Sequence, residues 1–352
     1  MSQAVFAIPG DLQTLTGGYG YDRALLSFLP SCGVDVKYLP LPEGFPFPDA
    51  ALCAQALTKL KSVPPDHILL VDGLALGALP AQSLSDLRAP VVALVHHPLG
   101  LESGLAPDVA RKLIENERDV LAQTCAVIVT SATTRDTLIS DFAVPADRIT
   151  IAEPGTDPAE RASGSGRDEI ELLSVGTITP RKGHVVLVEA LSHLTHLPWH
   201  LTLVGSEMRD PSCAQALHGA IAKHGLQERI AFTGECEADA LAQVYAGSDL
   251  FILPSLYEGY GMVLAEAMAR GLPIITTTGG AAAATVPDTA ALKVSPGDVE
   301  ALRAALMRAL GDAKLRASLS EASWQAAAKL PSWQDTASAV AQCLKRVREE
   351  AI

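Results

Sequence analysis

Two glutamates lie eight residues apart where an apolar run gives way to a predicted helix. In the stretch LPSLYEGYGMVLAEAMA, Glu258 follows the end of the predicted strand and Glu266 lies on the second helical turn. A carboxylate accepts two hydroxyl hydrogen bonds at once, which suits the diols of sugars and ribose. Glu266 stands among apolar residues, where a carboxylate needs a partner, so a solvent-facing position is the weaker interpretation.

Two adjacent cations follow another predicted strand. In SVGTITPRKGH (174–184), the chain turns at Gly176, and Arg181 and Lys182 come directly before a predicted helix. Cations beside a helix N-terminus favour a diphosphate group. The alternative is a pair of solvated surface charges.

A glycine-rich turn, TGGYGYDR (16–23), follows the first predicted strand and begins the first predicted helix. Gly17, Gly18 and Gly20 allow close backbone approach, and the helix N-terminus offers unpaired N–H groups to an anion. The spacing is not GxGxxG, and no acidic residue closes the second strand, so a dinucleotide site is disfavoured. A tight turn without a ligand is the alternative.

Two histidines end the apolar run VALVHHPLG (92–100). Neighbouring residues of a strand face opposite sides, so at most one of His96 and His97 is expected to face a ligand. A structural hydrogen-bonding role is the alternative for either ring.

Short apolar runs alternate with helical patterns through the chain, and the runs are continuous rather than alternating. Such strands are buried on both faces, so we expect an α/β fold with two Rossmann-like, doubly wound parallel sheets. In such sheets ligands bind beyond the carboxyl ends of the strands, which places the motifs in a cleft between the two domains. The expected strands are 4–9, 34–39, 67–72, 90–97, 126–131 and 148–155, then 170–176, 200–205, 229–234, 249–255, 273–278 and 291–294.

The expected domains follow from the same pattern. Residues 1–156 form an N-terminal domain, the polar segment 157–169 is a linker, and 170–330 form the second domain. Residues 331–352 are expected to form a helix that crosses back to the first domain.

Composition excludes several classes of protein. The 352 residues carry a net charge of −13, which disfavours nonspecific nucleic-acid binding. The six cysteines form no metal-binding pattern, and we interpret them as reduced apolar residues. No signal peptide and no apolar run of membrane-spanning length is recognised, so a cytoplasmic protein without an integral membrane segment is expected. Oligomeric state is left open.

The segment EGYGMVLAE (258–266) resembles the Glu-x7-Glu signature of retaining glycosyltransferases of family 4, which have the GT-B architecture. The likeness extends to the glycine-rich turn, the histidine after a first-domain strand, the Gly-x5-Lys-Gly element (176–183), LPS before the signature and GLPIITTTGG after it. The expected activity is therefore transfer of a hexose from a UDP- or GDP-linked sugar to a hydroxyl acceptor.

The resemblance also implies roles for particular residues. Catalytic roles fall to Glu258, His96, Lys182 and Arg181. The acceptor side would include Tyr19, His97 and Glu102. Donor-binding roles fall to Gly17, Gly18, Gly176, Thr177, Gly205, Gly259, Tyr260, Gly261, Met262 and Glu266.

One position departs from many relatives, which have an arginine where Thr177 follows Gly176; Arg181 is expected to supply that charge. No Asp-x-Asp pair follows a strand, so neither a metal nor any cofactor besides the donor is expected. The acceptor is left open between a small molecule, a glycan and a lipid-linked acceptor.

The mechanism and the class of activity leave alternatives. A front-face reaction, in which the leaving phosphate helps deprotonate the acceptor, is preferred on the resemblance to a covalent double displacement. Alternative functions are a GT-B nucleotide-sugar epimerase and a non-catalytic nucleotide-sugar-binding subunit. An NAD-dependent dehydrogenase is the remotest alternative, because the glycine-rich turn has the wrong spacing.

Overall fold

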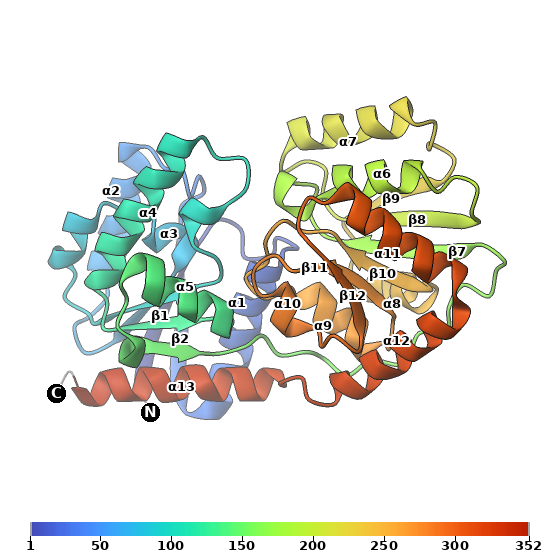
Figure 1. The fold of residues 1–352 in the computed structure, drawn as a ribbon. Helices are drawn as coiled ribbons and strands as arrows, with labels where there is room; N and C mark the ends of the chain where they lie inside the picture. The colour runs from blue at the N-terminus through green and yellow to red at the C-terminus, as the bar shows by residue number, and fades with distance from the viewer. Residues whose placement is uncertain (1, 351–352) are drawn as a thin grey trace. The chain divides into compact units, whose positions relative to one another are not determined.

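The computed structural model describes residues 2–350, which divide into two compact units (Figure 1). Unit 1 comprises the chain up to Gly155 together with the chain from Pro331 onward. Unit 2 is the continuous segment Thr156–Leu330. Each unit is an α/β layer structure with its own apolar core.

Unit 1 is built on six parallel strands in the order β2-β1-β3-β4-β5-β6. The central strands β3 and β4 are buried along their whole length, as expected of continuous apolar runs with helices on both faces. The strands are β1 (Ser2–Pro9), β2 (Val34–Leu41), β3 (Ile68–Asp72), β4 (Val91–Val95), β5 (Ala126–Val129) and β6 (Ile149–Ile151).

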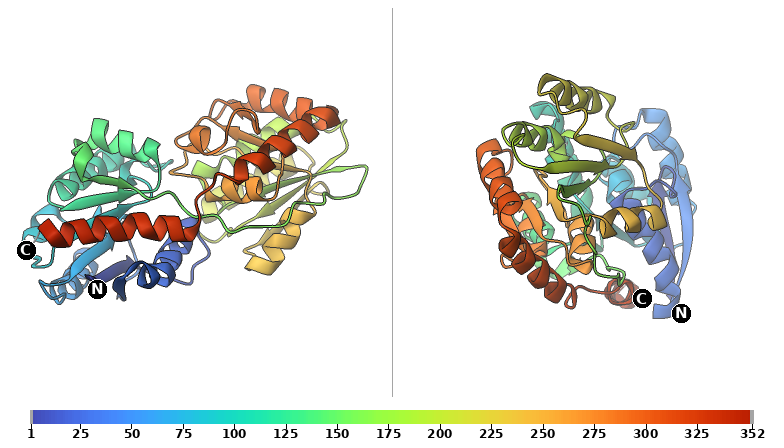
Figure 2. Two further views of the ribbon diagram at one scale, coloured as in Figure 1. Left: turned by 90° about the horizontal axis from the view of Figure 1, so that it is seen from below. Right: turned by 90° about the vertical axis from the view of Figure 1, so that its right-hand side faces the viewer.

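Helices cover both faces of the unit 1 sheet. One face packs against α1 (Gly17–Phe28) and the C-terminal helix α13 (Trp333–Glu350), which lie side by side (Figures 1 and 2). The other face packs against α2 (Ala50–Lys61), α3 (Gly73–Leu76), α4 (Pro107–Ala122) and α5 (Ala132–Phe142).

Unit 2 repeats the scheme with six parallel strands in the order β12-β11-β10-β7-β8-β9. Its strands are β7 (Ile170–Val175), β8 (Trp199–Val204), β9 (Ile230–Gly234), β10 (Leu250–Leu253), β11 (Ile274–Thr277) and β12 (Ala291–Val294). Its helices are α6 (His184–Ser192), α7 (Pro211–Lys223), α8 (Ala238–Ala246), α9 (Met262–Ala269), α10 (Ala282–Thr285), α11 (Val299–Gly311) and α12 (Ala313–Ala327).

The predicted α/β class and the two parallel sheets are confirmed, and every expected strand has a counterpart within a few residues. The region after β12 contains the helices α11, α12 and α13. It turns at Asp312, whose side chain accepts a hydrogen bond from the backbone N–H of Leu315 and caps α12.

The polar segment between the two sheets is held along unit 2. Ala162 and Ser163 donate their backbone N–H groups to the carbonyls of Arg270 and Ala246. Ser165 donates its backbone N–H and its hydroxyl to the carboxylate of Asp249. Hydrogen bonds therefore order a segment that contains neither helix nor strand.

No helix within residues 2–350 has the length and apolar character that crossing a membrane would require.

His184 at the start of α6 is an unpaired polar group in the unit 2 core. The residue is 2% exposed, and within residues 2–350 neither ring nitrogen has a hydrogen-bond partner. Burial, helped by the charge of Lys182, lowers the pKa of His184 to about 3. The folded state therefore holds a neutral ring that the unfolded chain protonates below its ordinary pKa of 6.5.

We expect His184→Leu to stabilise the protein, most at acidic pH. The native histidine loses stability as pH falls from 6.5 toward 3, by about 2 kcal/mol at pH 5, and leucine removes that loss. Urea unfolding at pH 8 and pH 5 measures the difference. His196→Leu, at an exposed histidine, serves as the control and should leave the pH dependence unchanged. An equal effect of His184→Leu at both pH values would contradict the assignment.

Candidate functional site

A buried ionic cluster lies where β10 ends in unit 2. Glu258 is 5% exposed and accepts hydrogen bonds through Oε1 from Lys182 Nζ at 2.7 Å and from Ser255 Oγ at 2.6 Å. Its Oε2 accepts from Arg181 Nη1 at 3.4 Å, and the same guanidinium donates to the carbonyl of Tyr257. Three side chains thus converge on one carboxylate.

The cluster decides the protonation state of Glu258. Burial by itself raises the pKa of this carboxyl, but the charges of Lys182 and Arg181 and the hydrogen bonds to it lower the pKa to about 2. Glu258 is therefore ionised at neutral pH. Two cations and one carboxylate leave a local charge of +1, which attracts an anionic ligand.

The loop after β7 explains the spacing of the Gly-x5-Lys element. A side chain at Gly176 would begin 3.2 Å from Lys182 Cε, so the glycine lets the lysine stem cross the loop toward Glu258. Gly205 packs against the same loop, because its φ is +146° and a Cβ there would collide with the Gly176 carbonyl. Gly176, Thr177 and Gly205 are therefore neighbours beside Lys182.

The main chain around Glu258 is fixed by the segment after β11. The N–H of Glu258 donates to the Gly279 carbonyl, and the N–H of Ala281 donates to the carbonyl of Glu258. Gly261 follows with φ +90° and begins α9, whose first residue is Met262. Gly259 and Tyr260 belong to this turn, and the Tyr260 carbonyl accepts from Thr285 Oγ1. The predicted turn residues are thus held beside Glu258.

Glu266 lies half-buried on α9 and has a specific partner. Its Oε2 accepts a hydrogen bond from the Tyr245 hydroxyl at 3.0 Å. Burial raises the pKa of Glu266, and the tyrosine and the nearby Arg270 partly oppose that rise. The Arg270 guanidinium lies 4.5 Å from the centre of the Tyr245 ring. The Tyr245 hydroxyl therefore holds one of the two carboxylate oxygens of Glu266.

In unit 1, His96 binds two buried carboxylates. Its Nε2 lies 3.2 Å from Asp22 Oδ1, on α1, and 3.3 Å from Asp72 Oδ2, at the end of β3. Gly18 packs beside the ring, because a Cβ there would lie 3.7 Å from His96 Cδ2. Among residues 2–350, Asp22, Asp72 and His96 form the group of three His, Cys, Asp or Glu side chains in which one nitrogen or oxygen atom of each lies within 4.8 Å of the other two. Nε2 is therefore within hydrogen-bonding distance of Asp22 and within ion-pair distance of Asp72.

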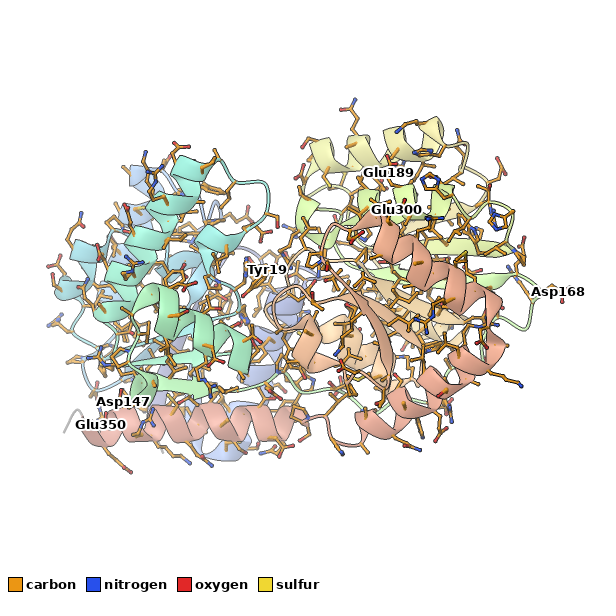
Figure 3. All side chains as sticks on the ribbon, in the orientation of Figure 1. Tyr19, Asp147, Asp168, Glu189, Glu300 and Glu350 are labelled. Carbon is orange, nitrogen blue, oxygen red and sulfur yellow. The ribbon has the colours of Figure 1, made fainter. Side chains whose placement is uncertain are left out.

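The remaining predicted residues of unit 1 lie within a few positions of Asp22 or His96 in the chain. Gly17 begins α1, which Thr16 caps. Tyr19 lies at the start of α1 (Figure 3) and donates its hydroxyl to the Pro9 carbonyl at 2.8 Å. His97 Nε2 lies 3.8 Å from Glu102 Oε2, so two residues predicted on the acceptor side are brought together.

Sequence reasoning missed several side chains that hold these groups. Asp22, Asp72, Ser255 and Tyr245 each contact a predicted residue. Glu117, 1% exposed on α4, accepts from the backbone N–H of Leu99 just after the two histidines. Asp72 offered a signal, because a charged residue ended an apolar strand that neighbours the strand of His96.

Two family models match adjacent parts of the chain. Residues 156–325 match the family described as Glycosyl transferases group 1, and residues 18–160 match the one described as Glycosyltransferase Family 4. Together the matches run from residue 18 to residue 325. The chain belongs to the group 1 / family 4 glycosyltransferases, so the family that the sequence resembles is confirmed.

Individual relatives agree with that assignment. Mannosylfructose-phosphate synthase of Agrobacterium fabrum is 28% identical over 63% of this chain and 53% of its own length. The matches span 53% to 63% of the length of three such curated relatives. Among solved structures, sucrose-phosphate synthase of Thermosynechococcus elongatus superimposes with a TM-score of 0.82 at 20% identity, over 99% of this chain and 100% of that one. Anabaena HepE in complex with UDP-glucose has a TM-score of 0.76 at 16% identity, with 98% of each chain covered. These structures establish the GT-B fold.

We expect Lys182→Met to cost about 3 kcal/mol at pH 8, because it leaves the buried Glu258 charge with fewer partners. In the native protein the depressed pKa of Glu258 contributes stability that is present above the unfolded pKa of 4.5 and lost as pH falls toward 2. In the variant that pKa rises, so Glu258 takes up a proton at mildly acidic pH. The cost should therefore shrink at pH 5.5.

Urea unfolding at the two pH values checks this expectation. Lys314→Met, at an exposed lysine of α12, is the matched control and should cost little at either pH. A cost of Lys182→Met that is the same at pH 8 and pH 5.5 would speak against the ion pair.

Proposed function

We propose that this protein is a retaining glycosyltransferase that moves a sugar from a nucleoside-diphosphate sugar to a hydroxyl acceptor without a metal ion. The observation that carries the proposal is the ionised Glu258, held by Lys182, Arg181 and Ser255 at the carboxyl end of β10. Family membership and the UDP-glucose complex of Anabaena HepE support a nucleotide-sugar donor.

The donor diphosphate would bind beside the cationic pair. Lys182 and Arg181 carry one charge more than Glu258 neutralises, so a diphosphate gains charge-assisted hydrogen bonds without displacing the carboxylate. Arg181 shares Glu258 with Lys182, which supports its taking the place of the arginine absent at Thr177. Glu266, with one oxygen bound by Tyr245, offers the other to the ribose diol.

The proposed reaction breaks the bond between the anomeric carbon and the diphosphate oxygen and forms a bond to the acceptor oxygen on the same face. The acceptor proton passes to the leaving phosphate. Lys182 and Arg181 stabilise the negative charge that develops there. The pairing of Glu258 with two cations makes it a poor nucleophile, because its charge is already compensated. Its proposed role is to accept hydrogen bonds from hydroxyl groups of the donor sugar.

The first test is thermal unfolding with UDP, GDP, ADP and NAD at millimolar concentration. A diphosphate at 100 times its Kd adds about 2.7 kcal/mol of stability. For domains of this size we expect a shift of roughly 5–10 °C with one diphosphate. No shift with any diphosphate, or a shift with NAD alone, would overturn the proposal.

Product analysis then separates transfer from the alternatives. UDP or GDP release that depends on a hydroxyl acceptor supports a transferase, whereas an isomerised sugar indicates an epimerase and an unchanged donor indicates a binding subunit. Glu258→Gln should keep the thermal shift and lose release, because the cationic pair remains while the contact to the sugar changes. Retention follows from the anomeric configuration of the product.

Metal independence has its own test. The rate of transfer should stay unchanged after incubation with excess EDTA and removal of the chelator, because Lys182 and Arg181 supply the charge stabilisation. Recovery of a lost rate on adding Mg²⁺ or Mn²⁺ would contradict the metal-free mechanism. Thermal stability measured alongside distinguishes a catalytic metal from a structural one.

A further inference from the structure

The cluster around His96 poses a problem of buried charge. Asp22 is fully buried, the Asp72 side chain is 6% exposed, and the His96 side chain is 23% exposed. Two ionised carboxylates this close and this poorly hydrated repel each other strongly. His96 lies between them and has a proton to give to both, through Nε2.

The contacts of the His96 ring distinguish the roles of its two nitrogens. Nε2 faces both carboxylates and must carry a proton, since a carboxylate is an acceptor. The Cδ2 edge of the ring lies against Gly18, and the ring of Tyr21 stands edge-on at 5.1 Å. Nδ1 has no partner among residues 2–350, so it is the nitrogen left for a ligand.

We propose that Asp22 and Asp72 are positioning residues that keep His96 doubly protonated through the neutral pH range, so that Nδ1–H is a fixed hydrogen-bond donor and never a base. Its partner must be an oxygen lone pair of the bound ligand. The N-terminus of α1 lies close to the cluster, because Gly18 packs against the Cδ2–Nε2 edge of the ring, and a helix N-terminus favours an electron-rich oxygen nearby. This corner of unit 1 therefore selects an oxygen that accepts hydrogen bonds.

The charges around the ring agree with that state. Burial lowers the pKa of His96, but hydrogen bonds to Asp22 and Asp72 and their charges outweigh it and raise the pKa to about 10. Burial, followed by the charge of Asp72, raises the pKa of Asp22. The groups that face the ring are Asp22 and Tyr21 on α1 and Asp72 at the end of β3, while the residue that follows β5 is the uncharged Thr130. Burial also raises the pKa of Tyr21, which stays neutral.

The inference bears on the reaction as well, and there it rests on the proposed function. A histidine that already carries both protons cannot accept the proton of an incoming hydroxyl group. His96 is thereby excluded as the base, which agrees with the proposed transfer of that proton to the leaving phosphate. The protonation state itself does not depend on the activity, so it can be measured on the protein alone.

The test is long-range ¹H–¹⁵N NMR of protein labelled in histidine, with the His96 signals assigned by their loss in His96→Gln. We expect both nitrogens of His96 to remain protonated from pH 6 to pH 9. In Asp72→Asn and in Asp22→Asn the titration should fall by about 1–3 pH units, because each removes one neighbouring charge. Both substitutions preserve shape. In Asp72→Asn the amide oxygen can still accept the N–H of Leu74 that caps α3.

Activity gives the second measurement. In Asp72→Asn, kcat/KM should fall as the pH rises above the lowered pKa of His96 and recover when the pH is lowered to 6. The unsubstituted protein should show no such descending limb in its profile of kcat/KM against pH. A structural role alone would reduce the folded fraction without creating that limb. Asp119→Asn, at an exposed position of α4, is the matched control and should change neither spectrum nor profile.

Three results would overturn the proposal. The first is a His96 that titrates near 6.5 in the unsubstituted protein. The second is a titration that neither Asp72→Asn nor Asp22→Asn moves. The third is a His96 spectrum that changes when EDTA or Zn²⁺ is added, which would make the cluster a metal site. A protein that lacks transferase activity but holds His96 protonated would refute the proposed function and leave this inference standing.

Discussion

Parallel strands that are buried on both faces leave only their ends for polar chemistry, and this constraint arranges both units. β3 and β4 are buried throughout, and Asp72 and His96 lie where these strands end. β7 ends at Val175 and β10 ends at Leu253, and the loops that follow them carry Lys182 and Glu258. Because all strands of a sheet point the same way, residues distant in sequence meet at one edge.

Each unit buries a charged group among partners of opposite charge, and the sign of the central group differs between the units. In unit 2 one carboxylate lies among two cations and a hydroxyl group, and it stays ionised. In unit 1 one imidazole lies between two carboxylates, and the pairing favours its protonated form. A lone ion in either place would shift its pKa and lose its charge. In unit 2 the two cations outnumber the one carboxylate, so a ligand there meets one net positive charge, which attracts an anion.

The sequence was sufficient for the strands and for the residues whose spacing is short. Glu258 and Glu266 share one loop and helix, and Gly176 and Lys182 share one loop, so local spacing reveals them. Asp22 and His96 are 74 positions apart, and Lys182 and Glu258 are 76 apart. Such pairs depend on strand order, which apolar runs do not specify.

The geometry of the loops explains the spacing of the residues within each motif. The six-residue step from Gly176 to Lys182 is what the chain needs to turn after β7 and return its lysine stem across a position without a Cβ. The step from Glu258 to Glu266 spans a left-handed glycine and the first turn of α9. It separates a carboxylate bound to cations at the strand end from one bound to Tyr245 on the helix. The two glutamates therefore differ in partners as well as position: compensated charge at Glu258 suits contact with neutral hydroxyl groups beside a diphosphate. The single phenolic hydrogen bond at Glu266 leaves a carboxylate oxygen able to receive a diol.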